Sequence, residues 1–217
     1  MEEVIAIQET LTVEIELIEE MLGTMPGNPE IYEEYIQTRN PNGIAPDETA
    51  AHPNGGQDND ENNKDNDNEE DILEKKSTIF ARREDQPIIW DYHVKGFLKA
   101  TAEALRRVPG SPEKKLTAYR RRIDTLIFVQ PRQIVLQCDP NLMGWCERPL
   151  RVVTAKGERI ALARSETVPT GTKLQARFEC LDQELMPFVR RWLNYGERSG
   201  LGQWRNSGKG RFIWRVI

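Results

Sequence analysis

The feature that most constrains this chain is a glycine pattern near its C-terminus. Glycines at 200, 202, 208 and 210 form the spacing G-x-G-x5-G-x-G, between an amphipathic pattern over 183–195 and an apolar stretch over 211–217. The first pattern predicts a helix and the second a strand. Glycine adopts positive φ and lets a ligand approach the backbone. The loop is therefore either a turn that merely ends a domain or a concavity whose N–H groups bind an anion.

The side chains between these glycines favour the binding interpretation. Arg205, Lys209 and Arg211 supply positive charge, and Trp204 supplies an aromatic face. A polyanion that carries bases fits this combination, because phosphates pair with the cations and bases stack on the ring. The alternatives are solvated loop charges and a tryptophan that fills the core under the loop.

Charge is distributed unevenly along the sequence. Residues 1–76 carry 4 basic and 21 acidic side chains, net −17, and residues 77–217 carry 26 basic and 14 acidic, net +12, which together give the net charge of −5. Nineteen of those 26 basic residues are arginine, whose planar guanidinium suits phosphate better than lysine does. The C-terminal part of the chain therefore suits a partner rich in phosphate.

The acidic segment 38–76 differs in kind from the rest of the chain. Its run 54–71 contains no apolar residue, so it cannot bury enough surface to offset its ordering entropy, and we expect a disordered insertion. One alternative is an acidic arm that shields the basic residues until RNA displaces it. A calcium loop is a weaker alternative, because the run lacks the glycine and glutamate spacing of an EF-hand.

Several classes of protein are not expected from this sequence. No apolar run reaches the roughly 18 residues of a membrane span, and the start, Met-Glu-Glu-Val, lacks a secretory signal. Cys138, Cys146 and Cys180 have no C-x-x-C spacing, which favours a reduced, cytoplasmic protein without zinc. Walker, Rossmann and H-E-x-x-H motifs are missing from the sequence, so we expect neither metal nor cofactor.

Hydrophobic periodicity predicts an alternation of strands and helices. The residues Leu11, Val13, Ile15 and Leu17 alternate with polar ones, as in a half-buried strand, and Asp91 is a candidate N-cap for the first long helix. We expect strands at 8–20, 77–83, 124–137 (with a bend at Pro131), 148–154, 159–164, 172–181 and 211–217, and helices at 29–36, 91–107, 113–123 and 183–195. Arg120, Arg121 and Arg122 would lie near the C-terminal end of the third of these helices, where a favourable interaction with the helix dipole offers a purely structural explanation for them.

With insertions set aside, this order is strand, helix, strand, strand, helix, strand. It predicts an α+β protein with the ferredoxin-like (RRM-like) βαββαβ arrangement and a glycine-rich loop before the last strand. Residues 1–37 would supply the first strand and turn, 38–76 the acidic insertion, and 77–217 the remainder, with a hairpin insertion at 138–170.

Three segments together resemble the RAMP superfamily of CRISPR-associated RNA-binding proteins. The glycine pattern resembles the glycine-rich loop of that family, and residues 87–99, which include Lys95-Gly96, are similar to a P-x-I-x-G-S-S-x-K-G-x-x-R segment of its backbone subunits. Residues 166–174 resemble their E-x-V-P-x-G-x-x-F entry into the third strand. The matches follow the family's order and cover most of residues 87–217.

The resemblance implies a protein that contacts single-stranded, guide-type RNA through its phosphate backbone and assembles with itself or with other CRISPR effector subunits. It implies RNA contacts at Lys95, Gly96, Lys99, Gly200, Gly202, Trp204, Arg205, Gly208, Lys209, Gly210 and Arg211, with a secondary basic patch at Arg120, Arg121 and Arg122. Asp91-Tyr92-His93 departs from the family's Gly-Ser-Ser. The loop 23–36 contains glutamates but no aspartate, so cleavage of a target is not expected.

Two other functions remain open from the sequence. The first is a metal-independent endoribonuclease in which His93 activates a ribose hydroxyl, with Tyr92 as proton donor and Lys95 or Arg205 stabilising the phosphate. His52, the other histidine, lies beside the acidic run. The second is a phage-type mimic or inhibitor of a CRISPR effector complex, in which the acidic segment occupies a basic groove of its host.

Overall fold

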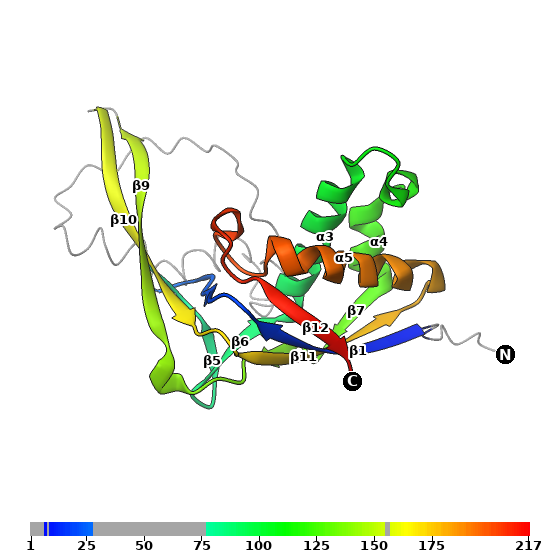
Figure 1. The fold of residues 1–217 in the computed structure, drawn as a ribbon, viewed down its shortest axis with the longest axis horizontal. Helices are drawn as coiled ribbons and strands as arrows, with labels where there is room; N and C mark the ends of the chain where they lie inside the picture. The colour runs from blue at the N-terminus through cyan, green and yellow to red at the C-terminus, as the bar shows by residue number, and fades with distance from the viewer. Residues whose placement is uncertain (1–6, 8, 28–76, 155–156) are drawn as a thin grey trace, which may run out of the picture.

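A four-stranded antiparallel sheet forms the base of the molecule. The computed structural model describes residues 7, 9–27, 77–154 and 157–217. The strands are β1 (Glu9–Leu17), β7 (Ile127–Gln130), β11 (Lys173–Cys180) and β12 (Phe212–Val216), in the order β12-β1-β11-β7 (Figure 1). Every adjacent pair is antiparallel. The alternation predicted for the first strand is present, because its apolar side chains are buried and the residues between them are partly exposed.

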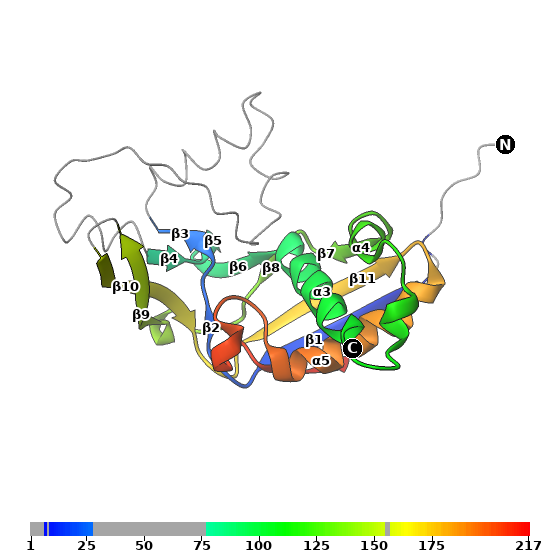
Figure 2. The same cartoon turned by 90° about the horizontal axis from the view of Figure 1, so that it is seen from above.

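Helices cover one face of this sheet. They are α3 (Asp91–Arg106), α4 (Tyr119–Leu126) and α5 (Met186–Ser199), and Figures 1 and 2 show them on the same side of the strands. The helices α3 and α5 meet at Gly196, where a Cβ would lie 2.5 Å from the rings of Phe97 and Phe212. Trp192 of α5 and Phe178 of β11 are both fully buried in the core. The predicted α+β class is confirmed, and these elements follow the predicted order along the chain.

A second sheet carries a long hairpin. Its order is β2-β10-β4-β3, with β9 paired to β10, and its strands are β2 (Met21–Leu22), β3 (Met25–Pro26), β4 (Ser77–Ile79), β9 (Gly144–Thr154) and β10 (Gly157–Val168). The predicted hairpin is present with longer strands than expected, and Figure 1 shows it projecting away from the helices. A third sheet, β5-β6-β8, consists of β5 (Ala81–Arg83), β6 (Gln86–Trp90) and β8 (Gln133–Val135).

Glu166 ties the hairpin to the neighbouring strands. It is 7% exposed, its Oε2 accepts a 2.9 Å hydrogen bond from the Phe80 N–H, and its other carboxylate oxygen pairs with Arg82. Its carbonyl accepts a 2.8 Å bond from the Gly23 N–H. The glutamate of the E-x-V-P segment therefore joins three chain segments, which gives it a structural role.

Four expectations about the elements are wrong. Helix α3 is capped by Trp90, so Asp91 is its first residue and not its N-cap. The predicted strand 77–83 is divided into β4 and β5. In the predicted strand 124–137 the expected break at Pro131 is present, between β7 and β8, but residues 124–126 belong to α4. The helix 113–123 is divided at Ala118, whose φ of 47° interrupts it, into the 3-10 helix η1 (Pro112–Lys115) and α4.

That division changes the position of the arginine cluster. Arg120 and Arg121 lie in the first turn of α4 and not near a helix end. The helix dipole disfavours cations at that position, so the expected electrostatic reason for them does not hold. The predicted helix 29–36 and the acidic segment 38–76 lie outside the described residues.

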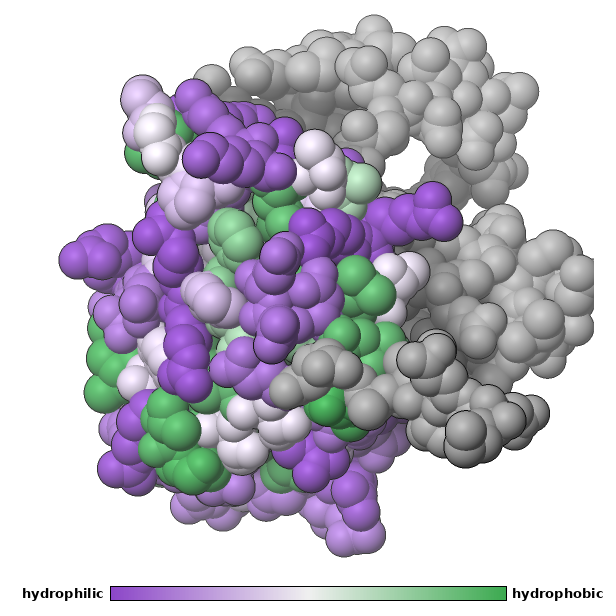
Figure 3. Space-filling model, turned by 90° about the vertical axis from the view of Figure 1, so that its right-hand side faces the viewer, coloured by the Kyte–Doolittle hydropathy of each residue, from purple (hydrophilic) through white to green (hydrophobic). Residues whose placement is uncertain are grey.

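The surface of the described part is mostly polar. Figure 3 looks onto the right-hand side of Figure 1 and shows apolar groups separated by hydrophilic ones. In the parts of the chain with described positions, no helix is both long and apolar enough to cross a membrane. The three cysteines are free thiols, and burial raises the pKa of Cys180 to about 12, so this thiol stays protonated at neutral pH.

Candidate nucleic-acid interface

The glycine-rich loop connects α5 to β12 and closes on itself. All four of its patterned glycines have positive φ, between 70° and 85°. A Cβ on Gly200 would lie 2.3 Å from the carbonyl oxygen of Lys209, and one on Gly210 would lie 1.8 Å from that of Leu201. The Leu201 N–H donates a 2.8 Å hydrogen bond to the Gly210 carbonyl, which joins the two ends of the loop. The chain's own backbone packing therefore requires glycine at 200 and 210.

Inside the loop, Trp204 and Arg205 form a short 3-10 turn. The residues 205–207 make the helix η4 (Arg205–Ser207), which Trp204 enters with a φ of 53°. Trp204 is 37% exposed, so it does not fill the core under the loop, which was the structural alternative for this residue. The Arg148 guanidinium lies 5.1 Å from its ring centre, and Arg148 also donates a 3.2 Å hydrogen bond to Gln203. The base of the hairpin therefore orients the tryptophan while leaving much of it accessible.

Arg205 is half-buried without a counter-charge among the described residues. Burial lowers the pKa of its guanidinium, and Tyr195 raises it only by a smaller amount. In the described part of the chain, no hydrogen bond or ion pair engages this side chain. A partly desolvated cation costs free energy that an anion can recover. Arg205 is therefore suited to an anionic ligand that comes from outside the described chain.

The other two cations of the loop have partners within the protein. Lys209 forms an ion pair with Glu20, and the hydrogen bond to Glu20 raises the pKa of Lys209. Arg211 donates a 3.4 Å hydrogen bond from Nε to the Glu197 carbonyl. Lys209 is thus largely neutralised, whereas Arg211 retains most of its donors for a ligand.

The predicted residues at the start of α3 lie toward α4 and β7. The Lys95 ammonium donates a 3.2 Å bond to the Asp124 carbonyl and lies 5.2 Å from the Phe128 ring centre. Burial lowers the pKa of Lys95, while Asp91 and Asp124 act in the opposite direction. Lys99 forms a 3.0 Å ion pair with Asp124. These lysines and the glycine-rich loop therefore lie on different sides of the start of α3.

The segment 18–27 connects the two groups. The site of a Cβ on Gly202 is 2.8 Å from the Met21 side chain, and Thr24 lies 3.3 Å from Nε2 of His93. The loop and the start of α3 thus pack against the same short segment. Gly96 itself has no atom within 4 Å of a Cβ position, so no packing in the described chain requires glycine there.

His93 has the contacts of a structural histidine. Its Nδ1 accepts a 3.3 Å hydrogen bond from the Trp90 N–H, and Nε2 faces the Thr24 hydroxyl. Burial lowers the pKa of the imidazole to about 4. With Nδ1 accepting, the neutral ring carries its proton on Nε2, so neither nitrogen is free to take a proton from a ribose. His52 lies outside the described residues.

The secondary patch is only partly available. Arg120 pairs with Glu103 at 2.5 Å, and Arg122 pairs with Asp182. The Arg121 side chain is exposed and makes no ion pair with the described residues. No group of three or more potential metal ligands occurs among the residues with described positions.

Sequence reasoning missed the contacts that orient the site. Arg148 lies 56 residues before Trp204, and Glu20 lies 189 residues before Lys209. Neither pair has a local sequence signal, because only the fold brings these residues together.

No protein-family model matches the chain, and no curated protein matches it in sequence. Among solved structures it is similar to a chain of the type III-B Cmr-beta complex bound to cognate target RNA, at TM-score 0.51 and 10% identity, over 96% of this chain and 61% of that one. It also aligns with a chain of a type IV-B CRISPR complex, at TM-score 0.49 and 13% identity, over 96% and 90%. The chain thus spans about three fifths of the length of the type III-B chain, with which it shares a fold.

Proposed function

We propose that the protein is an RAMP-like backbone subunit of a CRISPR effector complex. In this role it binds single-stranded, guide-type RNA mostly through phosphates and assembles along it with itself or with other effector subunits, in the cytoplasm. The shared fold and the three ordered sequence segments support the class of protein. Because a fold hosts many functions, the RNA-binding role rests on the site itself.

The observation that carries the proposal is the pairing of Trp204 with Arg205. One side chain offers an exposed aromatic surface, and the next is a half-buried cation without an anion among the described residues. Stacking of a base on an aromatic ring contributes about 1–3 kcal/mol and tolerates any sequence. A phosphate beside that base would supply the charge that Arg205 lacks.

The contacts of His93 favour binding over cleavage. An imidazole with a pKa of about 4 is a weak base at neutral pH, and both ring nitrogens face partners within the chain. We therefore propose that His93 has a structural role at the start of α3. Incubation with RNA in EDTA tests this assignment, because cleavage that His93→Ala abolishes would contradict it.

The charge reversal Arg205→Glu tests the proposed site. Losing one charge-assisted contact costs about 1.5–3 kcal/mol, so we expect affinity for a short single-stranded RNA to fall roughly tenfold or more. Fluorescence anisotropy at several salt concentrations measures it. The matched control is Arg190→Glu, since Arg190 is exposed on α5 well before the loop. Equal affinity of the two variants would exclude Arg205 from the interface.

A further inference from the structure

We propose that the protein has a second nucleic-acid contact, which binds the phosphate backbone of a duplex. It lies at the basic corner, defined as residues 103–122, where α3 ends and α4 begins. The basic corner carries seven basic and two acidic side chains, net +5 out of the +12 on residues 77–217. The proposal goes beyond the binding of a guide-type strand, because it does not depend on the glycine-rich loop.

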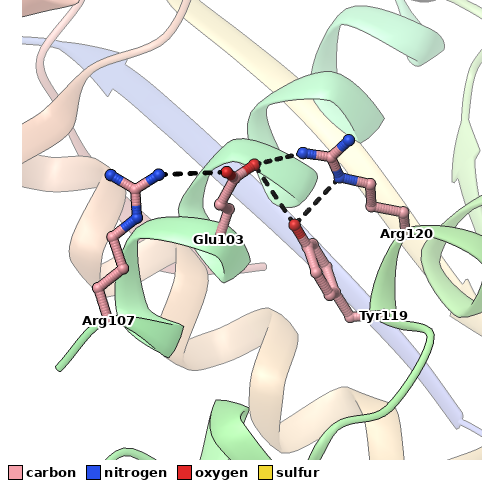
Figure 4. Close-up of polar contacts among 4 residues, drawn as sticks. All are labelled: Glu103, Arg107, Tyr119 and Arg120. Carbon is pink, nitrogen blue, oxygen red and sulfur yellow. Dashed lines mark hydrogen bonds and ion pairs between the residues drawn. The ribbon is translucent and has the colours of Figure 1, made fainter. Parts of the chain in front are cut away.

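The arginines of the basic corner are held in place by one carboxylate. Glu103 contacts Arg107 at 3.3 Å and Arg120 at 2.5 Å, and Tyr119 donates to it at 3.3 Å (Figure 4). The hydrogen bond from Arg120 lowers the pKa of Glu103, which therefore stays ionised. One negative charge thus positions two guanidinium groups, and the cluster keeps a net positive charge.

The second acidic residue of the basic corner faces inward. Glu113 is fully buried, and Arg191 of α5 binds its two oxygens at 3.0 and 3.3 Å. Arg106 donates to the carbonyls of Glu113 and Leu116, which ties the connecting segment to α3. The charge of Glu113 is therefore neutralised in the interior and does not offset the cations on the surface.

Three further cations of the basic corner have no counter-charge in the described chain. Lys114, Lys115 and Arg121 are exposed, and their side chains make no hydrogen bond or ion pair with the described residues. A cluster of like charges produces a local field that attracts a polyanion. An anionic polymer that spans the basic corner would contact these residues together with Arg107.

The aromatic contacts favour a duplex over a single strand. The guanidinium groups of Arg106 and Arg120 lie 5.0 and 5.8 Å from the Tyr119 ring centre, so arginines already occupy the ring. The basic corner can therefore bind phosphates without stacking on bases, which suits a duplex whose bases already stack on one another. The glycine-rich loop differs in degree, because the Trp204 ring has one guanidinium neighbour, that of Arg148, and is 37% exposed.

The basic corner and the glycine-rich loop lie toward different ends of α5. Phe97, near the start of α3, packs at Gly196, close to the loop, whereas the segment after α3 contacts Arg191 through Glu113. Phe97 and Arg106 are nine residues apart, which corresponds to about 14 Å along α3. Figure 1 shows the loop at the left-hand end of α5 and the basic corner above the right-hand half of that helix.

The double variant Lys114→Gln/Arg121→Gln tests the proposal in the full chain. The probe is a short labelled DNA duplex, titrated between about 50 and 200 mM salt. Removing two phosphate contacts should lower the slope of log K against log salt by about 2 and weaken binding. The control Arg83→Gln/Arg177→Gln removes the same charge from exposed positions on β5 and β11 and should keep the wild-type slope.

Two cross-measurements separate this site from the proposed RNA site. The corner variant, Lys114→Gln/Arg121→Gln, should bind single-stranded RNA with wild-type affinity. Arg205→Glu should bind single-stranded RNA more weakly and the duplex with wild-type affinity. Equal duplex affinity of the corner variant and its control would overturn the second site. Binding of poly-glutamate that is as strong as duplex binding, and that Lys114→Gln/Arg121→Gln also weakens, would overturn it as well. The basic corner would then recognise an acidic polypeptide.

Discussion

The surroundings of the glycines in the C-terminal loop and of Gly96 in α3 are opposite: the first are crowded by backbone, and the second is open. At Gly200 and Gly210 a Cβ would overlap the backbone of the same loop, and both have positive φ. At Gly96 a Cβ would meet nothing within 4 Å, and the residue lies inside a regular helix. Glycine there costs about 1 kcal/mol relative to alanine, without any packing in the described chain that requires it. The loop glycines thus report on the fold, while Gly96 is the better indicator of an external partner.

The largest effect is expected at Gly210. Substitution by alanine forces a Cβ onto the Leu201 carbonyl at a residue with φ of 70°, so we expect a loss of about 3 kcal/mol in the free energy of unfolding. Urea denaturation measures it. Gly110→Ala is the control, because that glycine also has positive φ but open space around it, and only the backbone strain of about 1 kcal/mol should appear. Similar losses in both variants would show that the loop does not need its close contact.

The next effect concerns His93, at the start of α3. Its pKa of about 4 in the folded state is below the ordinary 6.5, so protonation favours unfolding. The stabilisation is fully present above about pH 6.5 and is lost as the pH falls toward 4, which amounts to about 2 kcal/mol between pH 7 and pH 5. His93→Gln should remove this part of the pH dependence in urea denaturation. An NMR titration that gives His93 a pKa near 6.5 would contradict the buried, structural role.

The smallest effect on stability is expected at Gly96. Gly96→Ala should stabilise the protein by about 1 kcal/mol, because alanine is the better helix former. The same change should weaken RNA binding or assembly on RNA, because the added methyl group would occupy space that a partner backbone uses. Denaturation and RNA titration are measured on the same preparation.

Ala100→Gly, the reverse substitution in the same helix, is the control for Gly96→Ala. It lies in the same helix and should lower stability by about as much while leaving RNA affinity unchanged. If the Gly96→Ala variant binds RNA with wild-type affinity, the open space at Gly96 is not used by an RNA-bound partner, and the proposed role of Gly96 is wrong.

The sequence predicted regular elements better than it predicted contacts. The period of two in β1 and the apolar face of α5 come from the core itself, so both were visible in the sequence. The interruption at Ala118 was not, because alanine ordinarily favours helix and its φ of 47° is imposed by the surrounding chain. The strands β2, β3 and β4 are two or three residues long, which is too short for a periodic pattern.

The site was predicted in part for the same reason. Glycine spacing and the residues Trp204 and Arg205 are local features, and the structure places an exposed Trp204 beside a half-buried Arg205 in one turn. The contacts of the lysines could not be predicted in the same way, because they involve segments distant in sequence. Lys209 is neutralised by Glu20, and Lys95 faces Asp124. Local residue types thus identify a candidate loop, whereas the availability of each charge follows only from the folded contacts.

The most direct test of the account is a map of where RNA touches the protein. Photo-crosslinking of a thiouridine-containing single-stranded RNA, followed by trypsin digestion and mass spectrometry, identifies the contacting peptides. We predict a cross-link to the peptide 199–205, which carries Trp204, and its loss in the Trp204→Ala variant. Cross-links confined to other peptides, with none at the glycine-rich loop, would contradict the proposed interface.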